Sequence, residues 1–412
     1  MAEPRRRQYP VEHNLLLTAT LCLLAFGAVM VFSATSAPNV LDGGDGTGYL
    51  VKYLAYGAVG LLVMQILARG GLDIVRRFTP VLLGVAFVLL IAVKVPGIGV
   101  EVNGAQRWIG VGPLTFQPSE IMKLAIVIYM AQFLAERPKR MNSVKTLVSP
   151  LLIVVGAACL LIASQPDLGT AIIIGFTTLA LLLIAGAPMG VLGKLLGSAG
   201  LIVALAAFLE PYRRARLMSF LDPWADAGGA GFQAVQGQIA VGSGGLFGLG
   251  PGQSVQKIHY LPEAHTDFIL AVIGEELGLI GILALLTLYG LIAYAGLRTA
   301  KGARSQYERL LAAGITSLIV GQALLNVFAV LGLAPLTGEP LPFVSNGSTS
   351  ITVLLAAMGV LLNIASRGAL QLRAVAPPEK AQGSPPHADR DRSGGNGRAR
   401  GARSGGRRRA AG

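Results

Sequence analysis

Charged residues are scarce in this chain. Asp, Glu, Lys and Arg make up 13% of its 412 residues, whereas 53% are hydrophobic. Soluble globular domains carry about 25% charged residues, so the composition excludes that class. Ten apolar stretches are each long enough to cross a bilayer as a helix. They are residues 14–34, 50–68, 78–95, 119–135, 147–164, 168–186, 189–209, 267–296, 309–332 and 348–366. We therefore predict an all-α polytopic membrane protein with about ten transmembrane helices.

Cysteine and histidine are also rare, with two and four copies. Cys22 and Cys159 both fall within predicted spans, which excludes a disulfide framework for an outer domain. No histidine lies in a metal-ligand spacing. We interpret both cysteines as small apolar packing residues, and the residues predict no metal site.

Acidic residues are fewer than basic ones, 21 against 34. If the N-terminus is cytoplasmic, most basic residues outside the spans fall in cytoplasmic segments, as membrane proteins prefer. The outer loops then hold only Arg107, Arg213, Arg214, Arg216 and Lys257. We predict that both termini are cytoplasmic and that the first span is retained, since its apolar run is long for a signal peptide. The net charge of +13 then needs no nucleic acid to explain it.

Composition divides the chain into three parts. Residues 1–13 form a cytoplasmic N-terminal tail, 14–367 the ten-helix domain, and 368–412 a basic cytoplasmic tail that we predict to be disordered. That tail fits either contact with anionic membrane lipids or simple solvation. A large outer loop, 210–266, separates spans seven and eight, and we predict a structured cap with short interfacial helices. Its glycine-dense run, 242–252, serves either close backbone approach or ordinary turns.

Polar residues gather on the predicted outer side. Five segments stand out there: NGAQRW with QPSE (103–120), SQPDLGTA (164–171), PYRRARLMSFLDPW (211–224), LPEAHTDF (261–268) and LAPLTGEPLPFVSNGSTS (333–350). A carrier needs polar groups that are accessible alternately from both sides. The asymmetry therefore favours chemistry or binding on the outer face over transport.

Basic residues at two places in the chain suggest different roles. Arg213 and Arg214 lie in an outer loop, and arginine matches phosphate oxygens well; the alternative is packing against Asp222 or Glu210. Lys123 lies within the fourth span.

Carboxylates at membrane depth are functional candidates by default. Glu120 shares a helix face with Lys123, and an intramembrane ion pair of Lys123 with Glu275 or Glu276 is the simpler interpretation. Asp267 begins the eighth span. It is either a catalytic carboxylate or, together with Thr266, part of the N-cap of that helix.

Several segments resemble the signature segments of the SEDS family. They read LPEAHTDFILAVIGEELGLIG, NGAQRWIGVGPLTFQPSEIMKLA, SQPDLGTA, YRRARLMSFLDPW and LAPLTGEPLPFVSNGSTS. The resemblance extends from the first span to about Arg367. Ala264 and Gly274 are more similar to the division branch than to the elongation branch. The last outer loop departs from the family pattern PLPFVSYGGSS at 346–349.

This resemblance implies a peptidoglycan glycosyltransferase in the cytoplasmic membrane of a bacterium. It would polymerise lipid II, an undecaprenyl-pyrophosphate-linked disaccharide pentapeptide, with a class B penicillin-binding protein and other divisome proteins as partners. The acidic position of the HTDF motif, Asp267, is implied to be catalytic. The substrate-binding residues that we predict are Arg213, Arg214, Lys257, Glu263, His265, Arg107, Lys123 and Ser345.

The reaction implied by the family inverts an anomeric carbon in one displacement. One carboxylate that takes the acceptor's proton and basic groups that hold the pyrophosphate are a sufficient set. The sequence leaves open whether a divalent cation supplies part of the positive charge. It also leaves open three alternatives: a lipid II flippase, an inactive scaffold for the penicillin-binding protein, and an elongation-type polymerase.

Overall fold

The structure is a computed structural model. It describes residues 9–41, 43–102, 105–111, 114–138, 148–209, 218–229, 231–258 and 260–375. One compact unit, Met1–Arg373, contains the elements described below apart from the last two residues of the final helix. Most of both predicted tails lies outside the described residues.

Helices occur at all ten predicted spans. They are α1 (Val11–Leu41), α2 (Gly48–Arg69), α3 (Leu72–Ala92), α4 (Pro118–Glu136), α6 (Ile153–Ala163, after a π-helical turn at Val148–Leu152), α7 (Leu168–Ala185), α8 (Met189–Leu209), α11 (Ile269–Lys301), α12 (Gln306–Val330) and α13 (Ser348–Val375). Within the described residues, eight helices are long and apolar enough to cross a membrane, and Pro150–Ala163 and Met189–Ile202 are shorter apolar helices. The all-α polytopic prediction is confirmed.

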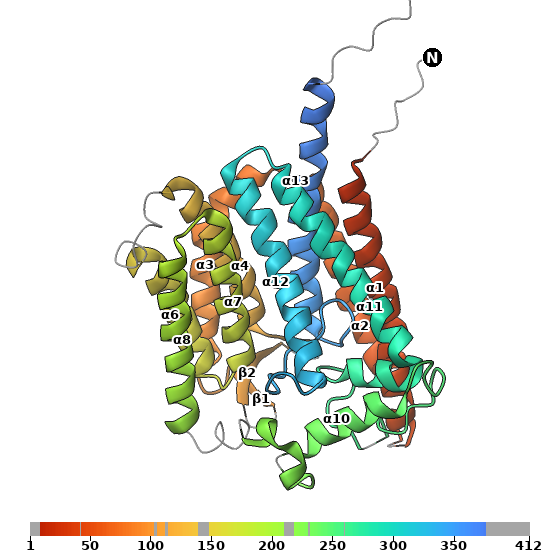
Figure 1. The fold of residues 1–412 in the computed structure, drawn as a ribbon. Helices are drawn as coiled ribbons and strands as arrows, with labels where there is room; N and C mark the ends of the chain where they lie inside the picture. Colours follow the sequence, from red (N-terminus) through yellow and green to blue (C-terminus); the bar gives the residue numbers. More distant parts are fainter. Residues whose placement is uncertain are drawn as a thin grey trace, which may run out of the picture. The chain divides into compact units, whose positions relative to one another are not determined.

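The helices differ in how much of their surface the protein covers. In the apolar stretch of α12, 78% of residues are buried, against 17% for α3. Figure 1 shows α12 between the pair α1 and α11 on one side and α4 and α7 on the other. The difference makes α12 a central helix of the bundle, whereas the exposed apolar residues of α3 are suited to face lipid.

The loop before α4 folds into a small sheet that the sequence did not predict. Its strands are β1 (Gly99–Val102), β2 (Ala105–Val111) and β3 (Leu114–Phe116), antiparallel in the order β1-β2-β3. In its register Gly99 pairs with Ile109, and Ile109 pairs with Phe116. Strands this short carry little alternating pattern, so turn and strand residues look alike in the sequence.

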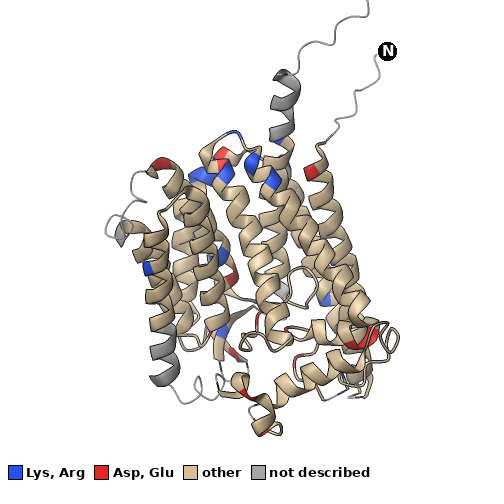
Figure 2. Ribbon diagram, in the orientation of Figure 1, with Lys and Arg blue, Asp and Glu red and all other residues tan. Residues whose placement is uncertain are grey.

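The predicted cap contains short helices, as expected. A 3₁₀ turn spans Pro223–Asp226, and α10 spans Phe232–Ser243. Figure 1 places α10 at the same end of the bundle as the sheet. Most of the Lys and Arg residues described lie at the opposite end in Figure 2.

Helix α11 is broken at Gly278, whose φ is 66° and ψ is −162°. The glycine strap, which we define as residues 242–252, fills the break. The Leu249 N–H donates to the Glu275 carbonyl at 2.9 Å, and the Gly250 N–H donates to the Glu276 carbonyl at 3.0 Å. In return, the N–H groups of residues 279 and 280 donate to the carbonyls of residues 245 and 246. The strap therefore satisfies backbone groups that lipid could not.

Gly248 shows why the strap is rich in glycine. A Cβ at this position would lie 2.1 Å from the Glu276 carbonyl oxygen, and its φ is +79°. Of the two uses that the sequence suggested for these glycines, close approach is correct at this point. The backbone that is approached is that of α11.

We expect Gly278→Ala to destabilise the protein by about 1–3 kcal/mol, because its backbone conformation is essentially restricted to glycine. The new Cβ would also lie 2.5 Å from the Gly248 nitrogen. Thermal unfolding in detergent would measure the loss. Gly290→Ala is the matched control, since nothing lies within 4 Å of its added Cβ in the same helix. Equal melting temperatures for the two variants would contradict a required break.

Candidate active site

Asp267 lies half-buried at the end of the cap, just before α11. The Asn326 side chain on α12 donates from Nδ2 to the Asp267 carbonyl at 2.7 Å and to the Glu339 carbonyl at 2.8 Å. A Cβ added to Gly338 would lie 3.9 Å from Asp267 Oδ2, so the carboxylate lies close to this glycine. Asn326 thus fixes the backbone of Asp267 beside the loop between α12 and α13.

The alternative role for Asp267 as a helix cap is wrong. The N-cap of α11 is Phe268. Thr266 donates from Oγ1 to the Glu263 carbonyl and has its hydroxyl 3.1 Å from Asp267 Oδ1. Thr266 therefore belongs to the turn that precedes the helix.

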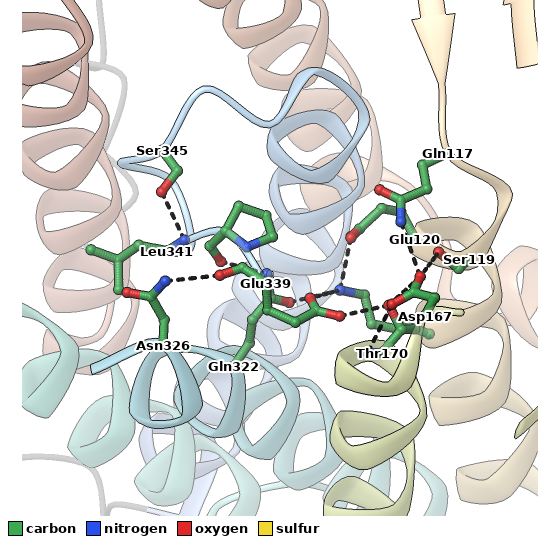
Figure 3. A network of polar contacts seen from close by, with 12 residues as sticks. Gln117, Ser119, Glu120, Asp167, Thr170, Gln322, Asn326, Glu339, Leu341 and Ser345 are labelled. Atoms are coloured by element: carbon green, nitrogen blue, oxygen red, sulfur yellow. Dashed lines mark hydrogen bonds and ion pairs between the residues drawn. The ribbon is translucent and has the colours of Figure 1, made fainter. Parts of the chain in front are cut away.

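Behind this loop is a buried polar network, drawn in Figure 3. The Lys123 ammonium lies 2.8 Å from Glu120 Oε1, 3.2 Å from Glu339 Oε2 and 2.9 Å from Gln322 Oε1. Lys123, Glu120 and Glu339 are each at most 3% exposed. Lys123 therefore pairs with Glu120, the residue that shares its helix face.

The network continues from Glu339 to Asp167 on another helix. Thr170 Oγ1 lies 2.6 Å from Glu339 Oε1 and 2.9 Å from Asp167 Oδ2. A hydroxyl has one hydrogen to donate, so both contacts are hydrogen bonds only if one carboxyl group is protonated. Burial raises the pKa of Glu339 to about 7, and the Lys123 charge opposes that rise. Burial therefore favours the protonated form of Glu339, and the Lys123 ammonium favours its ionised form.

Glu275 and Glu276 belong to a separate cluster, so the predicted ion pair of Lys123 with either of them is wrong. Glu276 Oε1 accepts from Lys257 Nζ at 2.7 Å, and Glu276 also accepts from the Ser33 hydroxyl of α1. Glu275 accepts from the backbone N–H of Val255 at 3.1 Å. We call this cluster the latch, because it ties the end of the strap to α11 and α1.

The latch bears on the predicted role of Lys257. Its ammonium is buried, pairs with Glu276 and donates to the Gly252 carbonyl at 2.8 Å. A pyrophosphate would have to displace Glu276 to reach it. The geometry therefore counts against Lys257 as a ligand of the leaving group and favours a structural role.

Two other predicted binding residues hold loops. Arg107 on β2 donates from Nε to the Gln165 carbonyl at 2.9 Å and from Nη2 to the Pro166 carbonyl. Ser345 is buried, and its hydroxyl accepts from the Leu341 N–H at 2.8 Å. Arg107 supports the turn that leads into Asp167, and Ser345 shapes the loop that contains Glu339.

The remaining predicted residues lie at or near the surface around Asp267. Glu263 is exposed and has a φ of 55°. The His265 ring packs against Tyr49 with centroids 4.6 Å apart, and burial lowers its pKa. Arg213 and Arg214 lie outside the described residues, so their role stays a prediction.

This arrangement offers one type of chemistry. The half-buried carboxylate of Asp267 lies at the surface. The Lys123 ammonium behind it is neutralised by its ion pairs with Glu120 and Glu339. Among the described residues, no group of three or more His, Cys, Asp or Glu side chains is suited to hold a metal ion. The site fits proton removal from a bound hydroxyl group by Asp267.

Comparisons with known proteins agree with this geometry. The family described as "Cell cycle protein", which takes in FtsW, RodA and SpoVE, matches residues 13–369. Stage V sporulation protein E of Bacillus subtilis is 41% identical, with 85% of this chain and 96% of that protein covered. The probable peptidoglycan glycosyltransferase FtsW of Geobacter sulfurreducens is 38% identical, with 85% and 94% covered.

Two solved structures are similar in fold. One is described as "Structural coordination of polymerization and crosslinking by a peptidoglycan synthase complex"; it matches with a TM-score of 0.72 and 29% identity, covering 85% of this chain and 96% of the other. RodA of Thermus thermophilus matches with a TM-score of 0.64 and 28% identity, covering 88% and 98%.

Proposed function

Since this chain belongs to the family of cell cycle proteins that includes FtsW, RodA and SpoVE, we propose that it acts as a peptidoglycan glycosyltransferase on lipid II at the outer face of the membrane. The FtsW relatives are named as probable peptidoglycan glycosyltransferases. The observation that carries the proposal is the placement of Asp267, half-buried and held by Asn326 beside Gly338. Polymerisation of labelled lipid II by the purified protein, with and without its partner, is the direct test.

In the proposed reaction, Asp267 takes the proton from the acceptor's sugar hydroxyl. The oxygen attacks the anomeric carbon of the donor from the face opposite the pyrophosphate, so one bond forms as the other breaks and the configuration inverts. The leaving group is undecaprenyl pyrophosphate. One base suffices, because no covalent enzyme intermediate is needed.

The buried network acts on the substrate indirectly, through the residues that position Asp267. Lys123 holds Glu339 by charge, and Asn326 joins the backbone of Glu339 to that of Asp267. We therefore assign Lys123 a positioning role in place of the predicted contact with substrate. Its enclosure leaves it no open path to a lipid-linked sugar.

A class B penicillin-binding protein is the partner that we propose, with divisome proteins around it, in the cytoplasmic membrane. The similar synthase complex is described as coordinating polymerization with crosslinking. The division role rests on the FtsW-like residues Ala264 and Gly274. Ala264 is buried, and a Cβ at Gly274 would lie 3.2 Å from the Val241 side chain of α10. Both residues therefore act through packing of the cap.

We expect an impermeant maleimide to label Leu221→Cys in intact cells, because the distribution of basic residues predicts that the cap lies outside. Leu221 is exposed in the structure. Lys301→Cys, also exposed and at the other end of α11, should react only after permeabilisation. The reverse pattern would place Asp267 in the cytoplasm and overturn the proposed mechanism.

Arg213 and Arg214 remain the candidates for the leaving-group clamp. Hydrogen bonds to charged groups contribute on the order of 1.5–3 kcal/mol each, so we expect replacement of either residue by alanine to slow lipid II turnover about 10- to 100-fold. Arg216→Ala is a nearby basic control. Normal turnover in both single variants and in the double variant would exclude the clamp.

A further inference from the structure

The glycine strap has an exposed apolar tip. Leu246, Phe247 and Leu249 are 61%, 78% and 49% exposed. No charged residue occurs anywhere in the strap. Ile280 and Leu283, which follow the break in α11, are also exposed. The tip therefore continues an apolar surface that begins on a transmembrane helix.

The height of the strap follows from the length of α11. Arg298 in its last turn lies about 20 residues beyond the break at Gly278. At about 1.5 Å per residue this helical piece is about 30 Å long, the thickness of the hydrocarbon core. With Arg298 at one boundary of the bilayer, the strap lies at the other boundary. Figure 1 shows α11 running from the end of the bundle opposite α10 to the end where α10 lies.

Phe247 also borders an apolar groove between α1 and α11. The groove has a volume of about 490 Å³ and is lined by Cys22, Phe26, Phe247, Leu277, Ile280, Gly281, Ala284, Leu285 and Leu288. No charged side chain lines it. Protein interfaces usually carry a polar rim around an apolar centre, and this surface is apolar from the groove to the strap tip. Hydrocarbon fits it better than a protein partner.

We propose that the tip of the strap is an interfacial anchor, and that its partner is the hydrocarbon of the leaflet on the Asp267 side. Apolar side chains at the boundary insert a few ångströms into the acyl region. The break in α11 holds the strap by four backbone hydrogen bonds, and the latch ties its end to the same helix. The anchor therefore fixes the height of the adjoining Asp267 segment above the bilayer. This inference rests on the membrane placement alone and not on glycosyl transfer.

Spin-label accessibility tests the anchor on the full-length protein in lipid nanodiscs. Cys22→Ala and Cys159→Ala remove the native thiols, and a nitroxide is then attached at Phe247→Cys. Leu283→Cys on α11 serves as the bilayer reference and Glu101→Cys on β1 as the aqueous reference, since both positions are exposed. Oxygen collects in hydrocarbon, whereas a nickel chelate stays in water. Size-exclusion profiles confirm that each labelled protein is folded.

The label at position 247 should show a severalfold higher ratio of oxygen to nickel accessibility than the label at 101, close to the ratio at 283. A ratio like that at 101 would place the tip in water and overturn the proposal. Low accessibility to both reagents would show that protein covers the tip, which would also overturn it. Neither result depends on enzymatic activity, so failure of the anchor and failure of the proposed function are distinguishable.

Discussion

Replacing Asp267 with asparagine is expected to stop glycan polymerisation almost completely. Loss of a general base typically lowers a rate by about 100- to 10,000-fold. Asparagine keeps the size of the side chain but cannot take a proton from the acceptor hydroxyl. The Asn326 contact is to the backbone carbonyl of residue 267, so it survives the substitution. The variant should therefore fold, bind its partner and make almost no glycan.

Glu101→Gln is the control for this experiment. It removes an exposed carboxylate on β1 that is not among the predicted substrate-binding residues. Turnover of labelled lipid II and the melting temperature are measured for both purified variants. The two measurements separate a loss of catalysis from a loss of stability. Asp267→Asn protein that polymerises near the wild-type rate would remove Asp267 as the base. A flippase or a scaffold would also tolerate this change, so the same result would revive those alternatives.

The spans were predictable because each depends on one local property, an apolar run long enough for a bilayer. The break in α11 was not predictable in this way. Residues 269–297 form a continuous apolar run around Glu275 and Glu276, and Gly278 resembles the other glycines of that run. What breaks the helix is a partner far along the chain, the strap at 242–252, whose backbone groups replace the missing helical hydrogen bonds. Sequence periodicity does not contain that pairing.

The same distinction between local patterns and contacts of distant segments explains which parts of the site could be predicted. Glu120 and Lys123 are three residues apart on one helix, so their contact could be predicted from spacing alone. Glu339 lies 216 residues from Lys123 and 169 from Thr170. Its segment, LTGEPLP, was recognised as polar, but nothing in it indicates which helix it meets. Asp167 was missed for the same reason, although SQPDLGTA also stood out. Glu120, Asp167 and Glu339 each lie in one of the five polar segments, and this is the signal that could have grouped them.

Replacing Lys123 with methionine should cost about 3–5 kcal/mol of stability, because it leaves buried carboxylates without their cation. The loss of the cation destabilises the Glu120 carboxylate most. Its Oε1 pairs with Lys123 at 2.8 Å, and its Oε2 is buried without a hydrogen-bond partner. Glu339 can take up a proton, since its pKa is already about 7. Thermal unfolding in detergent should show a much lower melting temperature, and a value equal to wild type would contradict the charge argument.

A second substitution distinguishes positioning from substrate contact. Glu120→Gln in the Lys123→Met background removes the unpaired charge, so the double variant should regain much of the lost stability. If Lys123 only supports Glu339 and the loop beside Asp267, polymerisation of lipid II should return together with the fold. If the ammonium binds the substrate, the double variant will fold and remain inactive. The positioning role requires the first outcome, because the structure connects Lys123 to Asp267 through Glu339 and Asn326 and not through a substrate.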